Sequence, residues 1–342
     1  MVGIALLTLA PGRMGGSETY ARGLAAALAE HGMRHYFVVS PPDATDASGG
    51  LPVAAAGVSA ARPRLVAFLY AAAAREALAA ADIVHYPLTI PLPPTSRPRV
   101  VTLHDLLHLD LPEFVPHHVR LFRRLAYDRA ARHADRVIVP SAFVRDRAIR
   151  KLGLDPGRVR VIHHAVDTAV FHPDGGMREP FLFYPARAWP HKNHALLFEA
   201  FARVRQRRPD LGLVLTGGGH DGLRLPEGVR SRGVVNIEEL ATLYRRASAV
   251  VFPSRYEGFG LPVLEAMASG CPVVAASGTA VEEIADGAAV TFAADGAEEF
   301  AHGILRALDA DSVLVERGVA VARSFSWAGV ARLHDEVYGE LA

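Results

Sequence analysis

The 342-residue sequence has one cysteine, almost no net charge and no long hydrophobic run. A disulfide or a multi-cysteine metal site needs more than one thiol, so neither can form within the chain, and we expect Cys271 to be a buried, inert thiol. The longest apolar run, residues 65–74, is too short to cross a bilayer. A formal net charge of +1 gives no general attraction to nucleic acids or other polyanions.

The N-terminal segment also lacks the features of a secretory leader. Residues 2–9 are apolar, but no basic region precedes them and no cleavage-like site is evident. We therefore expect a first β-strand rather than a signal peptide, and a cytoplasmic protein. Hydrophobic residues make up 50% of the chain and charged residues 21%, which is typical of soluble globular proteins. The length suffices for two domains of ordinary size.

Short apolar segments alternate with helical patterns in both halves of the chain. In the first half we expect strands at 2–9, 36–39, 82–86, 100–106, 137–140 and 158–163, and helices at 17–31, 65–81, 120–136 and 141–152. In the second half we expect strands at 181–184, 211–216, 249–253 and 273–275, and helices at 195–206 and 240–247. This alternation predicts two α/β domains, each with a parallel sheet, joined by the Pro- and Gly-containing segment 171–180.

The segment 254–270 is the most informative stretch of the chain. Gly258 and Gly260 allow a tight loop, Pro262 suits a first helical turn, and Gly270 ends the short helix expected over 263–269. A glycine-rich loop that leads into a helix N-terminus presents backbone N–H groups to an anion such as a phosphate.

Two carboxylates flank this turn, Glu257 in the loop and Glu265 in the helix. A phosphate would repel both, so they are better suited to accept hydrogen bonds from neutral hydroxyls such as those of ribose and a sugar. Two cations, Arg187 and Lys192, follow the expected strand 181–184 and could hold a diphosphate, since an Arg fork binds two oxygens and Lys acts as a point charge. Nearby Trp189 could either pack structurally or line the same cleft.

Other segments are more ambiguous. Gly15 and Gly16 precede a helix with Ser17 as its expected N-cap, which makes a second candidate phosphate cradle or only a tight turn. His104 ends a strand, where α/β sheets bind ligands, although Asp105 could simply cap the following turn and leave His104 a structural neighbour. The segment 217–222 matches G-x-G-x-x-G, but no helical pattern follows it. The histidine pairs at 117–118 and 163–164 lack metal-ligand spacing, and we interpret them as structural or surface residues.

Taken together, these motifs resemble the retaining glycosyltransferases of family 4. The resemblance rests on Glu257-Gly-Phe-Gly-Leu-Pro-Val-Leu-Glu265, together with Gly15–Gly16, His104–Asp105, Arg187 with Lys192, and Gly217–Gly218 in the same order. It implies an α/β GT-B fold, with two Rossmann-like parallel-sheet domains facing across a cleft. On this basis we expect an acceptor-side domain at 1–172, a donor-binding domain at 173–325, and a C-terminal helix at 326–342 that packs back on the first domain.

The resemblance also implies roles for single residues. Arg187 and Lys192 would neutralise the donor diphosphate, His104 and Glu257 would contact the transferred sugar, and Glu265 would accept the ribose hydroxyls. Backbone groups around the turn would complete the donor site, namely Gly15, Gly16, Gly258, Phe259, Gly260, Leu261, Pro262 and Val263. The base would lie near Gly217, Gly218, Val235 and Asn236. No pair of acidic residues suited to a divalent metal is evident, so we expect no metal or other cofactor.

The implied activity is transfer of a sugar from a UDP- or GDP-type nucleoside diphosphate sugar to an acceptor hydroxyl. The acceptor would contact the loops 40–64 and 87–98, and an Arg-rich helix at 120–132 could touch an anionic membrane or be a solvated face. The compact, Ala- and Arg-rich chain suits a glycosyltransferase of antibiotic biosynthesis, and it resembles those that act on avilamycin-type oligosaccharide antibiotics. Polysaccharide or glycolipid assembly is the alternative. A non-catalytic nucleotide-sugar-binding regulator and, more distantly, an NAD-dependent dehydrogenase are the other hypotheses.

Overall fold

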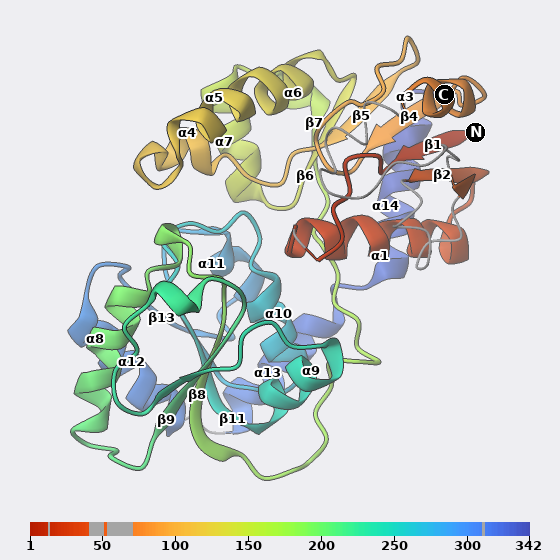
Figure 1. Cartoon of the computed structure of the whole chain (residues 1–342). Helices are drawn as coiled ribbons and strands as arrows, with labels where there is room; N and C mark the ends of the chain where they lie inside the picture. Colours follow the sequence, from red (N-terminus) through yellow and green to blue (C-terminus); the bar gives the residue numbers. More distant parts are fainter. Residues whose placement is uncertain (13, 41–50, 53–70, 310–311) are drawn as a thin grey trace. The chain divides into compact units, whose positions relative to one another are not determined.

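The computed structural model describes residues 1–12, 14–40, 51–52, 71–309 and 312–342. The chain divides into two units, residues 1–165 with 327–342 and residues 166–326 (Figure 1). The sequence placed the first boundary after residue 172, whereas 166–172 belong to the second unit. There Val166 donates its N–H to Phe325 O, and Phe171 packs in the second core. The proposed acceptor loop 40–64 lies almost wholly outside the described residues.

Within the described ranges, the first unit has a seven-stranded parallel sheet in the order β3-β2-β1-β4-β5-β6-β7. Its strands are β1 (Val2–Ala5), β2 (Tyr36–Ser40), β3 (Leu51–Pro52), β4 (Ile83–Tyr86), β5 (Arg99–Thr102), β6 (Arg136–Val139) and β7 (Val159–Val161). The main strands are buried and apolar, as expected of a parallel sheet that is covered on both faces.

Two groups of helices cover this sheet. One core joins α1 (Gly16–His31) and α14 (Trp327–Gly339) to one face. Another core includes α3 (Ala71–Leu78), α6 (Arg129–His133) and α7 (Ala142–Leu152). The remaining helical segments are α4 (Leu107–Asp110), η2 (Pro112–Phe114), α5 (His117–Arg123), the π-helical η3 (Arg124–Asp128) and η4 (Pro156–Arg158).

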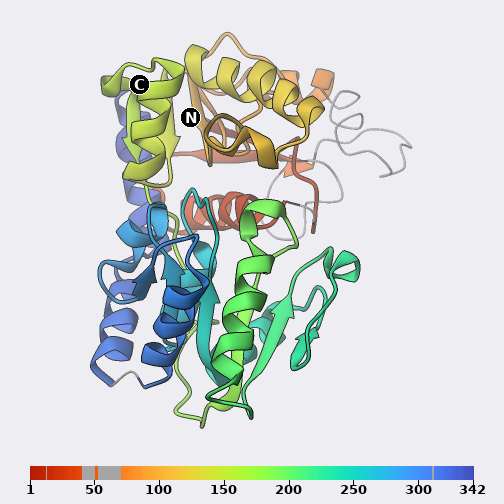
Figure 2. The same ribbon diagram turned by 90° about the vertical axis from the view of Figure 1, so that its left-hand side faces the viewer.

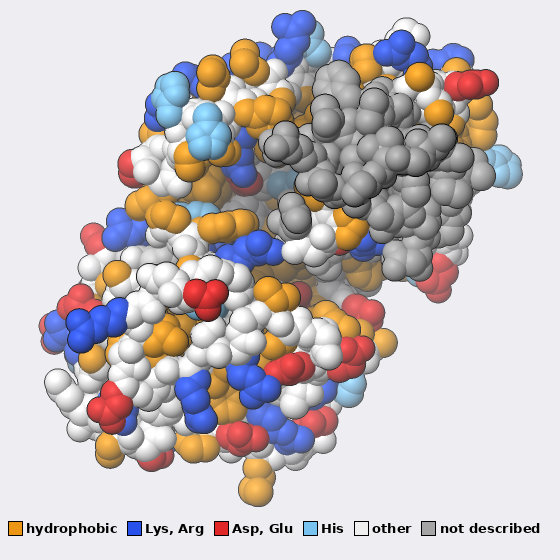
Figure 3. Space-filling view, viewed as in Figure 1, with side chains coloured by type: hydrophobic (Ala, Val, Ile, Leu, Met, Phe, Trp, Pro, Cys, Tyr) orange, Lys and Arg blue, Asp and Glu red, His pale blue; other side chains and the backbone are white. Residues whose placement is uncertain are grey.

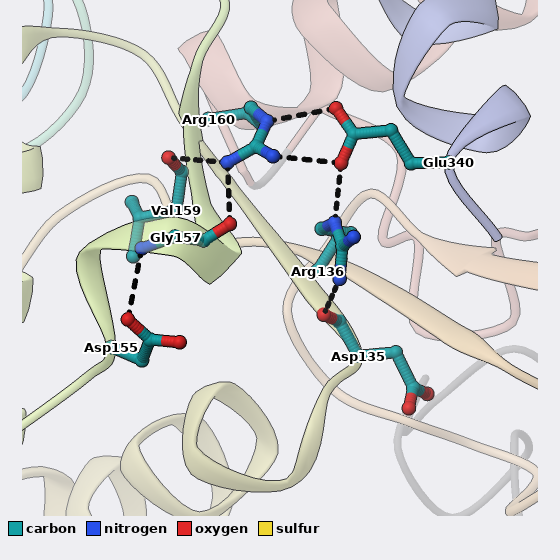
Figure 4. Close-up of polar contacts among 7 residues, drawn as sticks. All are labelled: Asp135, Arg136, Asp155, Gly157, Val159, Arg160 and Glu340. Atoms are coloured by element: carbon teal, nitrogen blue, oxygen red, sulfur yellow. Dashed lines mark hydrogen bonds and ion pairs between the residues drawn. The ribbon is translucent and has the colours of Figure 1, made fainter.

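The C-terminal helix α14 is tied to the first unit by polar contacts as well as by packing. Glu340, just beyond its end, accepts from Arg136 Nε at 2.6 Å and is bound bidentately by Arg160, through Nε at 2.9 Å and Nη2 at 2.8 Å (Figure 4). A fork of this kind fixes both distance and orientation. Gly23 of α1 approaches the ring of Trp327 so closely that an added Cβ would overlap it.

The second unit has, in its described part, a six-stranded parallel sheet in the order β10-β9-β8-β11-β12-β13. Its strands are β8 (Glu179–Pro185), β9 (Gly212–Thr216), β10 (Val229–Ser231), β11 (Ala247–Phe252), β12 (Val273–Ala276) and β13 (Val290–Phe292). The chain runs outward from β8 through β9 to β10, then returns to β11 on the other side of β8. The junction of β8 and β11 is therefore a topological switch point, the place where α/β sheets bind ligands.

Helices cover both faces of the second sheet. In Figure 2, α8 (His194–Arg205) and α12 (Ala297–Leu308) lie in front of the sheet. The other face carries α9 (Ile237–Arg246), α10 (Leu261–Ala268) and α13 (Ser312–Arg323) (Figure 1). The remaining helical segments are α11 (Ala280–Ala285), η5 (Pro190–Lys192) and η6 (His220–Gly222). Throughout the described ranges, each helix is too short or too polar to span a bilayer.

Several local predictions need correction. Gly15, with φ of 60°, is the N-cap of α1, so Ser17 lies inside the helix rather than capping it. The helix expected at 120–136 ends at His133, because Arg136 already belongs to β6. The strand expected at 2–9 ends at Ala5. By contrast, Ser141 caps α7 as predicted, with its hydroxyl accepting from the N–H of Val144.

Candidate functional site

The carboxyl ends of β8 and β11 lead into two loops that lie side by side. The loop after β8 carries Arg187 and Lys192, and the loop after β11 carries Glu257. Arg255 donates its N–H to the carbonyl of His191 at 2.8 Å, which links the two loops directly. The structure therefore brings the predicted cations and the first predicted glutamate to the same switch point.

Lys192 and Glu257 form an ion pair. The Lys192 Nζ atom lies 2.6 Å from Glu257 Oε1, and the two side chains are only 13% and 11% exposed. The ammonium also lies 5.3 Å from the centroid of the Phe252 ring. The backbone of the lysine is fixed as well, since Tyr184 donates its hydroxyl to Lys192 O at 2.6 Å. Little solvent screens this pair, so its charges act strongly on whatever binds next to it.

Glu265, the second predicted glutamate, is held by a residue that the sequence did not indicate. Tyr244 of α9 is fully buried and donates its hydroxyl to Glu265 Oε2 at 2.7 Å. Burial raises the pKa of Glu265 to about 7, although the hydrogen bond from Tyr244 opposes this shift. Tyr244 lies on the apolar face of α9, where a core role is the ordinary expectation, so only the packing of α9 against α10 reveals its contact.

The turn before α10 has the geometry that its glycine and proline predict. Gly260 is the N-cap with φ of 102°, and a Cβ there would lie 2.8 Å from Val281 Cγ2. Pro262 occupies the first turn. Val263 donates its N–H to Gly260 O at 2.9 Å and proline has none, so among 261–263 only Leu261 is left to offer a backbone donor. Phe259 is buried against Phe325 in the core.

The glycine-rich loop after β9 packs against the loop after β8. Gly217, with φ of 119°, donates its N–H to Gly233 O at 2.8 Å, and Gly218 O accepts from Ala188 N at 3.0 Å. The segment after Gly219 forms the short η6 and not an α-helix, as its sequence predicts. Asn236 caps α9 through its side chain, which accepts from Glu239 N at 2.8 Å. Any contact of Asn236 with a ligand must therefore share that oxygen or use other atoms.

Three further predicted site residues lie in the first unit. Gly15 and Gly16 stand at the N-terminus of α1, and His104 follows β5. Tyr20 packs edge-on against His104, with ring centroids 5.2 Å apart. His164, which we interpreted as a structural or surface residue, is buried and stacks on Tyr20 with ring centroids 4.5 Å apart.

His104 is held in a defined tautomer. Its Nε2 lies 2.7 Å from Pro87 O, and because a carbonyl can only accept, Nε2 carries the proton. Burial lowers the pKa of His104, so the ring is neutral at pH 7. Within the described part of the chain, its buried Nδ1 has no hydrogen-bond partner. A ligand hydroxyl could therefore donate to this atom.

Asp105 does cap the turn that follows His104. Its Oδ1 accepts from Leu107 N at 3.0 Å and from Arg123 Nη1 at 2.8 Å. Burial raises the pKa of Asp105, but the charge of Arg123 and the hydrogen bond from Leu107 outweigh it and hold the pKa below its usual value. Cys271 is buried, as predicted, and burial raises the pKa of its thiol to about 12, which leaves it unreactive at neutral pH.

Comparison with known families agrees with this arrangement. Residues 14–170 match the Glycosyltransferase Family 4 domain, and residues 179–310 match the domain described as Glycosyl transferases group 1. O-antigen chain mannosyltransferase B of Escherichia coli is 29% identical over 276 residues, covering 72% of this chain and 71% of that protein. D-inositol 3-phosphate glycosyltransferase of Streptomyces avermitilis is 33% identical over 60% of this chain, but only 52% of its own length is covered.

Solved structures show the same architecture. Sucrose-phosphate synthase from Thermosynechococcus elongatus aligns with a TM-score of 0.76 at 21% identity, covering 99% of this chain and 98% of that one. The Anabaena HepE protein in complex with UDP-glucose aligns with a TM-score of 0.74 at 18% identity over the whole of both chains. At these identities the likeness concerns the fold. The chain thus matches a Glycosyltransferase Family 4 domain in its first part and a domain of Glycosyl transferases group 1 in its second part, and its two parallel-sheet units have a GT-B fold.

Proposed function

We propose that this protein transfers a hexose from a nucleoside diphosphate sugar to an acceptor hydroxyl, with retention of configuration and without a metal ion. The Lys192–Glu257 pair at the β8–β11 switch point carries the proposal, because it combines a cation for phosphate with an acceptor for sugar hydroxyls. Arg187 follows the same strand and supplies a second, forked cation. UDP is the first nucleotide to test, since the structurally similar HepE protein was solved with UDP-glucose.

The chemistry follows from these charges. As the bond between the sugar C1 and the diphosphate oxygen breaks, negative charge grows on the β-phosphate. Lys192 and Arg187 stabilise that charge more in the transition state than in the ground state. The acceptor oxygen bonds to C1 on the face that the diphosphate leaves, and the acceptor proton passes to a β-phosphate oxygen. This same-face path retains the configuration at C1.

Other residues orient the donor. Glu257 uses the carboxylate oxygen not engaged by Lys192 to accept from a sugar hydroxyl, and Glu265 accepts from ribose. His104 accepts a sugar hydroxyl at Nδ1, because its other nitrogen is committed to Pro87. In the second unit the backbone N–H of Leu261 completes the diphosphate contacts, and in the first unit we assign an anion-binding role to the backbone of Gly15 and Gly16.

For the acceptor we propose a saccharide hydroxyl. The relatives named above include one named for O-antigen chains and one named for inositol phosphate, and both of these compounds carry several hydroxyl groups. Both an oligosaccharide antibiotic and a cell-surface polysaccharide belong to this class. Matched transfer assays with free oligosaccharides and with lipid-linked saccharides distinguish these two kinds of acceptor.

A peripheral membrane contact is a further part of the proposal. Exposed residues of α5 and η3 form a stripe, and Figure 3 shows hydrophobic and histidine side chains side by side over α5. The stripe, which we call the α5 face, consists of His117, His118, Leu121, Arg124 and Leu125. Leu121 is 50% exposed and Leu125 is 65% exposed beside the cationic Arg124. An apolar stripe with cations suits the surface of an anionic bilayer.

The donor proposal is tested by titrating the protein with UDP, GDP, ADP and TDP and with the corresponding hexose donors. We expect saturable binding of one nucleotide and slow hydrolysis of its sugar donor, even without acceptor. Binding without any turnover across saccharide acceptors would favour a nucleotide-sugar-binding regulator. Absence of binding to every nucleotide would contradict the proposal.

A further inference from the structure

His220 occupies a position between three loops of the second unit. It lies in η6, is 4% exposed, and contacts the ends of β8 and β10 with its two ring nitrogens. Its Nε2 lies 2.9 Å from Ala186 O, and its Nδ1 lies 2.8 Å from Ser231 Oγ. Since Gly217 and Gly218 precede it in the chain, one side chain joins the β8, β9 and β10 loops.

The direction of each hydrogen bond in this cluster is determined. Ala186 O can only accept, so in the neutral imidazole Nε2 of His220 carries the proton and Nδ1 is the acceptor. The hydroxyl of Ser231 therefore donates to Nδ1, and its oxygen accepts the N–H of Gly233 at 3.2 Å. The result is one chain of hydrogen bonds, each donated in the same direction, from Gly233 through Ser231 and His220 to Ala186.

The loops that this chain connects are in tight contact. A Cβ on Gly217 would lie 2.9 Å from both Ala186 C and Arg187 N, and its φ of 119° also disfavours other residues. Gly217 N donates to Gly233 O at 2.8 Å, which closes the arrangement on the β10 side. A shift of His220 would consequently be passed to both neighbouring loops.

We propose that His220 is a positioning residue that sets the spacing between the diphosphate-binding and base-binding parts of the donor site. Ala186 directly precedes the proposed diphosphate ligand Arg187, while Gly233 leads into the proposed base-binding pair Val235 and Asn236. His220 touches neither the sugar nor the phosphates in this account and acts through the loops. The inference rests on the donor-binding function proposed above.

Substitutions can separate the two halves of this hydrogen-bond chain, the half that reaches Ala186 and the half that reaches Ser231 and Gly233. His220→Asn keeps an acceptor for Ser231 but is too short to reach Ala186 O, so it frees the Arg187 loop. His220→Gln keeps a donor for Ala186 O and loses the link to Ser231. Ser231→Ala likewise releases only the loop that leads to the proposed base-binding residues. Ser248→Ala is the matched control, because its hydroxyl bond to Glu179 O, 2.7 Å long, lies at the opposite end of the same sheet.

The variants are compared by the Kd of the nucleotide that the wild type binds, by donor KM and kcat, and by Tm. We expect Ser231→Ala and His220→Gln to raise Kd and KM about tenfold with kcat within about twofold, because displacement of the base-binding loop weakens ground-state and transition-state binding alike. We expect His220→Asn to lower kcat about tenfold, because Arg187 acts on the leaving group.

Folded variants with unchanged Kd, KM and kcat would overturn the role of His220 while leaving the proposed function intact. If Ser248→Ala changed Kd, KM and kcat as much as the His220 variants do, the changes would reflect general destabilisation, and this result would also overturn the role of His220. A wild-type protein that binds no nucleotide would refute the proposed function and this inference together.

Discussion

The Lys192 Nζ and Glu257 Oε1 atoms lie 2.6 Å apart, although 65 positions separate the two residues in the chain. The contact exists because β8 and β11 are neighbours in the sheet and their carboxyl ends open toward the same side. In this arrangement a carboxylate holds the ammonium in place before a phosphate arrives. The pair thus gives the proposed donor site its cation and orients the carboxylate that we propose as the sugar ligand.

Replacement of Lys192 is the first prediction. Lys192→Ala removes charge stabilisation from the leaving diphosphate and leaves Glu257 without its partner, so kcat/KM for the donor should fall about 100-fold or more. Lys192→Arg should retain part of the activity because it keeps the charge but not the geometry. Steady-state kinetics measure both, and His302→Gln on the exposed surface of α12 is a control. Unchanged kinetics in folded Lys192→Ala would contradict the assignment.

Donor affinity should depend on pH through Glu265. The pKa of this carboxyl is about 7 in the free protein, where burial disfavours its charged form. Ribose hydroxyls donate to the ionised form, so binding lowers the pKa and releases a proton. Affinity should therefore rise as pH increases toward 7 and level off above it. Calorimetry in buffers of different ionisation enthalpy measures the released proton.

Tyr244→Phe sharpens this test. The hydrogen bond from Tyr244 lowers the pKa of Glu265, so its loss should move the midpoint of the affinity profile to higher pH. A purely structural role of Tyr244 would weaken binding without moving the midpoint. A flat profile in the wild type between pH 6 and 8 would rule out an ionised Glu265 as the ribose acceptor.

The first unit should be acid-labile. Burial lowers the pKa of His334 to about 4 and holds those of His85 and His164 well below the usual 6.5. The unfolded chain therefore binds more protons than the native one between pH 6.5 and about 4, so stability falls as pH decreases through this window. His334 alone should account for about 2 kcal/mol between pH 7.5 and 5.

Urea unfolding at pH 7.5 and pH 5 measures this effect. His334→Gln removes one titrating group, so the pH dependence of unfolding should become smaller even if the variant is less stable at neutral pH. His31, exposed at the end of α1, offers the matched control in His31→Gln, which replaces a histidine outside the buried cluster. Equal stability of the wild type at both pH values would contradict a buried neutral histidine cluster.

The α5 face should bind anionic bilayers. Leu121→Ser combined with Leu125→Ser removes the exposed apolar area but keeps every charge, so binding to vesicles with anionic lipids should weaken by about tenfold. Vesicle co-sedimentation measures this, with zwitterionic vesicles and the Val313→Ser variant, exposed on α13, as controls. If the wild type and the double variant bound anionic vesicles equally well, the α5 face would be excluded as a membrane contact.

Local chemistry explains which parts of the site could be predicted. The Gly260–Pro262 turn and the end of the helix at Gly270 follow from backbone preferences of a few adjacent residues, and the strand-end rule sufficed to group Arg187 and Lys192. Tyr244 could not be identified, because its contact with Glu265 depends on how α9 packs on α10. The helices α11 to α13 have apolar faces and Thr279 caps α11, but we assign no element there from the sequence.

His220 illustrates the opposite case. Its segment matches a dinucleotide fingerprint, and the structure confirms the prediction that no α-helix follows it directly. The same glycines instead permit close contact between loops, and the histidine joins them. Only the pairing of Gly217 with Gly233 and the position of Ser231 reveal this, and both depend on the order of β8, β9 and β10 in the sheet.

The central claim is tested most directly by following UDP- and GDP-hexose donors by proton NMR in the presence of the protein and a saccharide acceptor. The account predicts consumption of one donor and a product whose anomeric proton shows the configuration of that donor, in the presence of a metal chelator. A product with inverted configuration, or no consumption of any donor by folded protein, would contradict it.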